Sequence, residues 1–436
     1  MKTFILLLMA SLTSSILAFE DAVTYCQKNP IDGTSTLHKI QDSDFPNEEI
    51  YIHSYVKNKI DPKKKTVLFF SGGPGASPRS SEFKLDSVNI IFFEQRGMGC
   101  SRPSSPGLFL NPKFYSSKKS ISDAARILDD YKINQAIIYG HSYGTILATM
   151  FAHFYPEKTD KVIIEGVIGN ANIGIWQSEH RRMKLQETFE ALDQNLKEKV
   201  LKYSHHSEIP TSWFSVVGTM MSYLDNGYDT YKTFLANILE MDEESLVPFI
   251  KNFYAQKGLL NTELLAAHDG DITFGMITCQ ELSGTHPTSS MRLEFDSKNQ
   301  LQWDNQNEDD KNYCQPLRID HSRSLDMADY PVVRPITYLI GEDDGATDLA
   351  QAKYHLKHVA KGVKNFLVLK NGGHLPNLAS LKDNRPCNDE EDCKNLSALK
   401  AQVKFFENIV IEKNSILKSD IIEVNKLIAL PWIIYE

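Results

Sequence analysis

Four short apolar runs in the first part of the chain each end in a loop rich in glycine or polar residues. The runs are 66–70, 88–93, 136–139 and 162–164. Runs that are apolar throughout are typical of strands buried on both faces, as in a parallel sheet. Helical patterns at 122–131 and 145–154 alternate with the later runs, which favours a wound α/β architecture. An alternating stretch at 50–56 predicts early antiparallel strands.

The pattern becomes mostly helical from about residue 170 to 329. An amphipathic stripe in this part predicts core packing, and it consists of Leu185, Phe189, Leu192, Leu196 and Val200. The polar segment 296–311 is expected to be a surface loop. Apolar strands return at 336–340 and 366–369, and a last helix is expected at about 396–411. We therefore predict a mostly parallel sheet formed by 19–170 and 330–436, with a helical cap at 171–329.

The N-terminal segment and the charge distribution limit where the protein acts. Lys2, the apolar run 4–10 and Ala18 predict a secretory signal peptide over 1–18, cleaved after Ala18. The apolar run is too short to span a bilayer, so a secreted or periplasmic protein without a membrane anchor is expected. The net charge is −9 and the charges are interleaved, which argues against a nucleic-acid partner. The oligomeric state stays open.

Cysteines and histidines are the residues that would reveal disulfides or a metal site. Six cysteines in an exported chain favour disulfides, and Cys387 with Cys393 is expected to close a small loop, although several could be free buried thiols. The chain has no pair of CxxC motifs and no HExxH motif, so neither a metal nor a cofactor is predicted. Four histidines that could otherwise bind an ion are assigned to solvated surface: His205, His206, His355 and His358.

The strongest chemical signal is the sequence GHSYG at 140–144, between an apolar strand and a helix. A serine hydroxyl needs exposure and a base to act as a nucleophile, and a sharp strand-to-helix turn presents it. We predict Ser142 as nucleophile and the backbone N–H of Tyr143 as an oxyanion donor. The loop SGGPG at 71–75 follows an earlier strand, and Gly73 is the second candidate donor. A plain tight turn would use the same glycines.

A base and an acid are expected on loops after later strands. His374 follows an apolar strand within GGH, and it is the predicted base. The acid that orients a catalytic histidine is chosen among Glu342, Asp343 and Asp344. Asp344 is our choice and Asp343 remains possible. The chain order serine, acid, histidine predicts the α/β-hydrolase fold.

Four motifs together resemble the proline iminopeptidase and tripeptidyl aminopeptidase family of serine exopeptidases. They are SGGPG at 71–75, EQRGMGCS at 94–101, GHSYG at 140–144, and the late loops GEDD and GGH. The family usually has histidine where Ser71 stands and aspartate where Glu94 stands.

The resemblance also implies how a substrate is held. Cap acids in this family grip the free amino group of the substrate, because a carboxylate pairs with an ammonium. Glu281 in the segment ITCQE is our candidate and Glu165 is the second, although either could be an ordinary solvated acid. A disulfide between Cys279 and Cys314 is implied in the same way.

These features predict an exported serine aminopeptidase acting on short peptides with a free N-terminus. A carboxylic-ester hydrolase with the same triad is the main alternative. An epoxide hydrolase or dehalogenase needs an acid where Ser142 stands. A non-catalytic binding protein would usually lack one member of the triad. Preference for proline or for release of a tripeptide is left open.

Overall fold

The structure is a computed structural model of the 436-residue chain. It describes residues 22–30, 33–78, 85, 87–103, 105–171, 178–256, 269–282, 292–303, 314, 317, 319, 324–374, 393, 400–401, 403–426, 428 and 430–435. The expected signal peptide 1–18 and Cys387 lie outside these ranges, so neither expectation is addressed. No helix among the described residues is long and apolar enough to cross a membrane.

A mixed sheet of nine strands runs through the described part of the chain, in the order β1-β2-β4-β3-β5-β6-β9-β10-β11. The neighbours from β4 through β10 pair in parallel, whereas β1, β2 and β11 are antiparallel to their neighbours. The strands are β1 Thr34–Ile40, β2 Ile50–Val56, β3 Thr66–Phe70, β4 Asn89–Phe93, β5 Ala136–His141, β6 Thr159–Glu165, β9 Ile336–Gly341, β10 Lys364–Leu369 and β11 Trp432–Ile434. The predicted antiparallel strand at 50–56 and the predicted parallel runs are confirmed.

Helices cover both faces of this sheet, which is why its central strands are apolar throughout. One face packs against α4 (Ser117–Asp130), α5 (Gly144–Phe154) and α13 (Leu349–His358). The other face packs against α15 (Lys418–Asn425) and a π-helical turn, Phe406–Ile411. Near the N-terminus lie α2 (Ala22–Lys28) and the short α3 (Pro106–Phe109). The predicted helix over 396–411 is thus confirmed in its last part as this turn, whereas α15 and β11 had no prediction.

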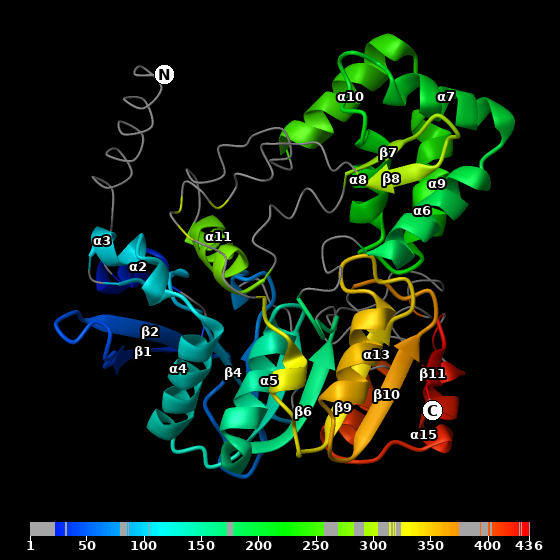
Figure 1. Ribbon diagram of the computed structural model, residues 1–436. Helices are drawn as coiled ribbons and strands as arrows, with labels where there is room; N and C mark the ends of the chain where they lie inside the picture. The colour runs from blue at the N-terminus through cyan, green and yellow to red at the C-terminus, as the bar shows by residue number, and fades with distance from the viewer. Residues whose placement is uncertain are drawn as a thin grey trace, which may run out of the picture.

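Between β6 and β9 the chain forms a helical cap above the carboxyl ends of the parallel strands (Figure 1). Its helices are α6 (Glu179–Glu190), α7 (Gln194–Ser204), α8 (Trp213–Met221), α9 (Gly227–Ile238) and α10 (Glu243–Gln256). The predicted apolar stripe lies in the hydrophobic core of this cap. Asp193 interrupts the stripe, because its side chain caps α7 and starts a second helix there.

Two parts of the inserted segment differ from the sequence expectation. The polar segment 296–311 was expected to be a surface loop, but Leu301–Trp303 forms β8, paired with β7 (Leu293–Phe295). Leu301 is fully buried in the cap core, which explains the strand. Helix α11 (Asp269–Glu281) lies apart from α6–α10 (Figure 1), and its buried side chains join the hydrophobic core on the face of the sheet that α4, α5 and α13 cover.

Candidate active site

Ser142 occupies a sharp turn between β5 and α5. Its φ is +54°, a left-handed conformation that is strained for a residue with a side chain. A Cβ on Gly140 would lie 2.3 Å from the carbonyl oxygen of Gly144, and one on Gly144 would lie 2.1 Å from that of Phe70. Both glycines of GHSYG are therefore required by close backbone packing, and the Ser142 N–H donates to the Glu165 carbonyl at 2.9 Å.

The acid nearest to His374 is Asp344. His374 Nδ1 lies 2.9 Å from Asp344 Oδ2, and both side chains are buried. Burial by itself would lower the pKa of His374, but the Asp344 charge and hydrogen bond, with Glu165, raise it above its usual value. Burial likewise opposes ionisation of Asp344, yet His374 and backbone N–H groups bring the pKa of Asp344 below its usual value. Each member of the pair thus stabilises the charged form of the other.

The three adjacent acids of GEDD have three different partners. Glu342 accepts a hydrogen bond from the Asn371 N–H at 3.2 Å, and Asp343 forms an ion pair with Lys184 of the cap at 3.1 Å. Only Asp344 contacts the imidazole among the acids of this loop. The sequence left the choice between Asp343 and Asp344 open, and the short distance from Asp344 to the imidazole favours Asp344.

Ser142 and His374 lie on neighbouring loops at the carboxyl ends of β5 and β10. The chain at Glu165 and Gly166 lies between them. A Cβ on Gly166 would lie 2.8 Å from the His374 ring, and the carbonyl of the preceding Glu165 accepts from the Ser142 N–H. The rings of His141 and His374 are 5.0 Å apart between centroids. No hydrogen bond joins the Ser142 and His374 side chains within the described residues.

The loop after β3 packs against the turn that carries Ser142. A Cβ on Gly72 would lie 3.0 Å from Ser142 Cβ, and Gly73 has φ +106°. The N–H groups of Gly73 and Tyr143 find no acceptor among the described residues. Two backbone donors next to a serine are the elements of an oxyanion hole.

Glu281 reaches the N-terminus of α4 from the end of α11. Its carboxylate accepts from the Ser117 N–H at 2.9 Å and from the Ser117 hydroxyl at 2.5 Å. The same hydroxyl lies 2.8 Å from the Tyr143 hydroxyl. Burial raises the pKa of Glu281, against the Ser117 hydrogen bonds, which lower it. A chain of hydrogen bonds therefore joins Glu281 to the residue after Ser142, and Ser117 is a link that the sequence reasoning missed.

Glu165 lies at the end of β6 and is fully buried. Its carboxylate accepts a hydrogen bond from the Tyr139 hydroxyl, and its charge acts on His374. The disulfide Cys279–Cys314 is present, as the resemblance implied, and it ties the end of α11 to the chain that follows.

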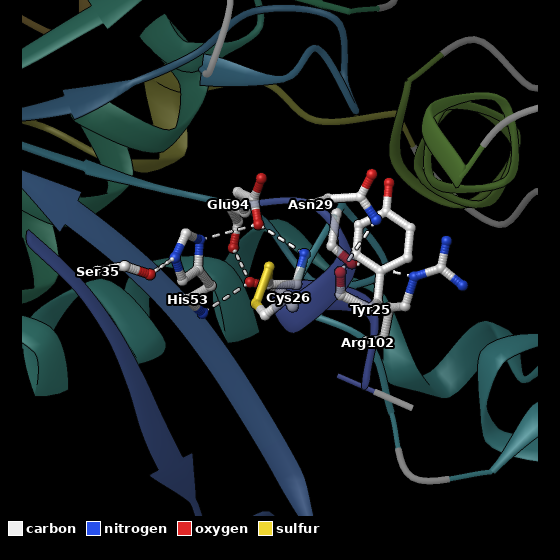
Figure 2. The surroundings of a disulfide bond; sticks show 10 residues. Tyr25, Cys26, Asn29, Ser35, His53, Glu94 and Arg102 are labelled. Atoms are coloured by element: carbon white, nitrogen blue, oxygen red, sulfur yellow. Dashed lines mark hydrogen bonds and ion pairs between the residues drawn. A yellow bond between two sulfur atoms is a disulfide. The ribbon is translucent and has the colours of Figure 1, made fainter. Parts of the chain in front are cut away.

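The segment EQRGMGCS is held by buried contacts around a disulfide (Figure 2). The Glu94 carboxylate accepts from the Cys100 N–H at 2.7 Å and lies 3.0 Å from His53 Nδ1. A second disulfide joins Cys100 to Cys26 of α2. Cys26, His53 and Cys100 are one group of potential metal ligands among the described residues, but the disulfide already occupies both sulfurs. The Glu94 carboxylate thus bridges His53 and the Cys100 N–H in this buried site.

One histidine expected on the surface is buried. His355 has 0% exposure and bonds to the Thr149 hydroxyl at 2.9 Å and to the Tyr338 hydroxyl at 2.8 Å. Burial lowers its pKa to about 3, so it is neutral. The prediction was wrong because His355 lies on the face of α13 that packs on the sheet, whereas His205 is exposed as expected.

Comparison with known proteins gives one family match and several relatives. The family described as alpha/beta hydrolase fold matches residues 65–208. A putative proline iminopeptidase of Mycoplasma genitalium is 24% identical over 206 residues, which are 41% of this chain and 64% of that protein. The proline iminopeptidase of Neisseria meningitidis is 27% identical over 116 residues, 26% of this chain and 36% of that protein. The matches thus span between about a third and two thirds of these relatives.

Solved structures resemble the chain more distantly. The proline iminopeptidase-related protein of Thermus thermophilus has a TM-score of 0.38 and 14% identity, over 80% of this chain and 93% of that one. A serine hydrolase of Cycloclasticus zankles has a TM-score of 0.41 and 13% identity, over 87% and 100% of the two chains. These scores are low, so the fold assignment depends on the family match and the strand order.

Proposed function

We propose that this chain, an α/β hydrolase that resembles the proline iminopeptidases, is a serine aminopeptidase acting on short peptides. The observation that carries the proposal is the buried Asp344–His374 pair on the loops next to the strained turn of Ser142. A buried acid–histidine pair beside a presented serine is the arrangement that acyl transfer requires.

In the proposed reaction Ser142 attacks the scissile carbonyl. His374 donates its Nδ1–H to Asp344, which leaves Nε2 to take the serine proton and to return it to the leaving amine. The Gly73 and Tyr143 N–H groups stabilise the negative charge on the tetrahedral oxygen. Water then hydrolyses the acyl-enzyme by the same route in reverse. No cofactor enters the scheme.

We propose that Glu281 binds the substrate's free amino group, with Glu165 as the second candidate. Glu281 is only partly buried, whereas Glu165 is completely buried and accepts from the Tyr139 hydroxyl. Burial raises the pKa of the Glu281 carboxyl, and a substrate ammonium would favour its charged form. An ammonium bound to Glu281 would be connected to Tyr143, the residue after Ser142, through the Ser117 hydroxyl.

We further propose that the protein is exported and works without a membrane anchor. The two disulfides among the described residues support an oxidising compartment, because cytosolic thiols are usually kept reduced. We also propose that the boundaries between the core and the cap lie at about residues 170 and 330.

The test combines a fluorophosphonate probe with a small substrate panel. Wild type should be labelled and Ser142→Ala should not. Peptide amides with a free N-terminus should be cleaved, and the same peptides with an acetylated N-terminus should not. Glu281→Gln should raise KM for the free peptides more than it lowers kcat. Labelling together with faster cleavage of short acyl esters, and no peptide cleavage, would instead identify an ester hydrolase.

A further inference from the structure

A short turn of the cap lies directly against the loop that carries His374. This cap turn is residues 222–226, between α8 and α9. The His374 N–H donates to the Tyr223 carbonyl at 3.1 Å, and the Asn226 N–H donates to the Asn371 carbonyl at 2.8 Å. Between them, the Gly373 N–H donates to Oδ1 of the Asp225 side chain at 2.9 Å. Three of the four residues 371–374 are thus bonded to the cap turn.

The fit between the two segments is close. A Cβ on Gly373 would lie 2.5 Å from the carbonyl of Leu224 and 2.6 Å from the carbonyl oxygen of Tyr223. The edge of the Tyr223 ring faces the His374 ring, with centroids 5.1 Å apart at 68°. The cap turn therefore touches both the backbone and the imidazole of His374.

The loop also has contacts with the core, and one of them reaches its backbone, because the Asp343 N–H donates to the Gly372 carbonyl at 2.9 Å. Asp344 fixes the tautomer and the rotation of the imidazole, and Glu342 holds the Asn371 N–H. Neither of these two side chains bonds to the backbone N–H of Gly373 or of His374. Those two N–H groups donate to the cap turn instead, to Asp225 Oδ1 and to the Tyr223 carbonyl.

We propose that the cap turn, chiefly through Asp225, positions His374 for proton transfer. This inference rests on the proposed function, in which His374 is the base. Asp225 is a positioning residue, because its carboxylate contacts the loop backbone and not the reacting atoms. Catalytic groups must be held within roughly half an ångström of their productive positions. The cap would then hold the base as well as the substrate, so a cap that moved away would withdraw the base.

The test compares Asp225→Ala with Asp225→Asn on a cleaved peptide amide or ester. Alanine removes the acceptor for the Gly373 N–H, whereas the asparagine oxygen can still accept. We expect Asp225→Ala to lower kcat roughly tenfold or more, since small misplacements of reacting groups cost up to about a hundredfold. KM should change less than about twofold. The midpoint of the pH profile of kcat should stay unchanged, because the charges that raise the pKa of His374 are those of Asp344 and Glu165. Asp225→Asn should recover most of the rate.

Two further variants make the result specific. Asp229→Ala removes an exposed acid of the same cap and should behave as wild type. Gly373→Ala pushes the loop away from Leu224 with Asp225 intact, and it should lower kcat in the same manner. Melting temperatures separate loss of the fold from misplacement of the loop.

Several outcomes would overturn the inference. An active wild type with unchanged kcat in Asp225→Ala and Gly373→Ala would overturn this inference alone. Equal damage by asparagine and alanine at 225, or a shifted pH midpoint, would also reject positioning through this hydrogen bond. A wild type that neither labels with fluorophosphonate nor cleaves any amide or ester would overturn the proposed function together with it.

Discussion

Replacing Asp344 by asparagine tests the site more sharply than removing the side chain. Asp344 Oδ1 accepts from the N–H groups of Ala346 and Thr347 at 2.8 and 2.9 Å. In Asp344→Asn the amide oxygen must stay at that position, because an NH₂ group there would face two donors. The NH₂ group is then directed to the Oδ2 position, which lies 2.9 Å from His374 Nδ1.

An amide NH₂ group at that position changes the tautomer of His374. His374 Nδ1 lies 2.9 Å from the Oδ2 position and 3.0 Å from Oδ1, and the amide donor at the nearer position favours Nδ1 as an acceptor. The ring proton then moves to Nε2, which can no longer take the serine proton. Loss of the correct tautomer in such a triad costs roughly 10⁴ in kcat, and we expect a fall of about 10³ to 10⁴ with KM little changed. Stability should fall much less than in Asp344→Ala, since the amide keeps the bonds to Ala346 and Thr347.

The assay is steady-state cleavage of a peptide amide, with the rate of fluorophosphonate labelling as a second readout. Asp343→Asn is the matched control, because its carboxylate pairs with Lys184 rather than with the imidazole. Its kcat should stay within a few-fold of wild type. Retention of more than about a tenth of kcat by Asp344→Asn, or an equal loss in Asp343→Asn, would refute the assignment of the acid.

Three other predictions concern pH, packing and the disulfide. The pKa of His374 is raised, and this base must be neutral to act. We therefore expect kcat/KM to fall on acidification with a midpoint above the usual histidine pKa, and a midpoint below that pKa would contradict the Asp344–His374 pairing. Gly144→Ala places a Cβ 2.1 Å from a carbonyl oxygen of β3, so it should unfold the protein or strongly lower its melting temperature. Gly107→Ala is the control, because the new atom meets open space, and it should keep or raise the melting temperature. Changing both Cys279 and Cys314 to serine should lower the free energy of unfolding by roughly 2–4 kcal/mol in chemical denaturation, and an unchanged midpoint would show that the crosslink is not formed in solution.

The central sheet could be predicted from the sequence because its strands carry a strong local signal. A run such as 66–70 is buried at every position, which is typical of a strand in a parallel sheet covered on both faces. GHSYG could be placed for a related reason, since close backbone contacts require both glycines, Gly140 within the turn and Gly144 against β3. By contrast, β11 has three residues and α15 eight, and neither pattern is long enough to stand out.

Contacts between distant segments could not be predicted in this way. Nothing local distinguishes Asp343 from Asp344, since their different partners come from the cap and from the loop after β10. His355 was misplaced for the same reason, because the spacing of two histidines does not tell which one faces the sheet.

The cap illustrates the limit most clearly. Its apolar stripe predicted a core, and that core exists, but the residues that matter to His374 lie in the turn after α8, where no periodicity operates. Asp225 has no pattern around it that would distinguish it from an exposed acid such as Asp229. Its contact with the Gly373 N–H arises only because the cap folds back over the carboxyl ends of the strands. Proteins with the same sheet and triad but a different cap must therefore hold the histidine loop by other means, and a transplanted cap would have to bring an acceptor for that N–H with it.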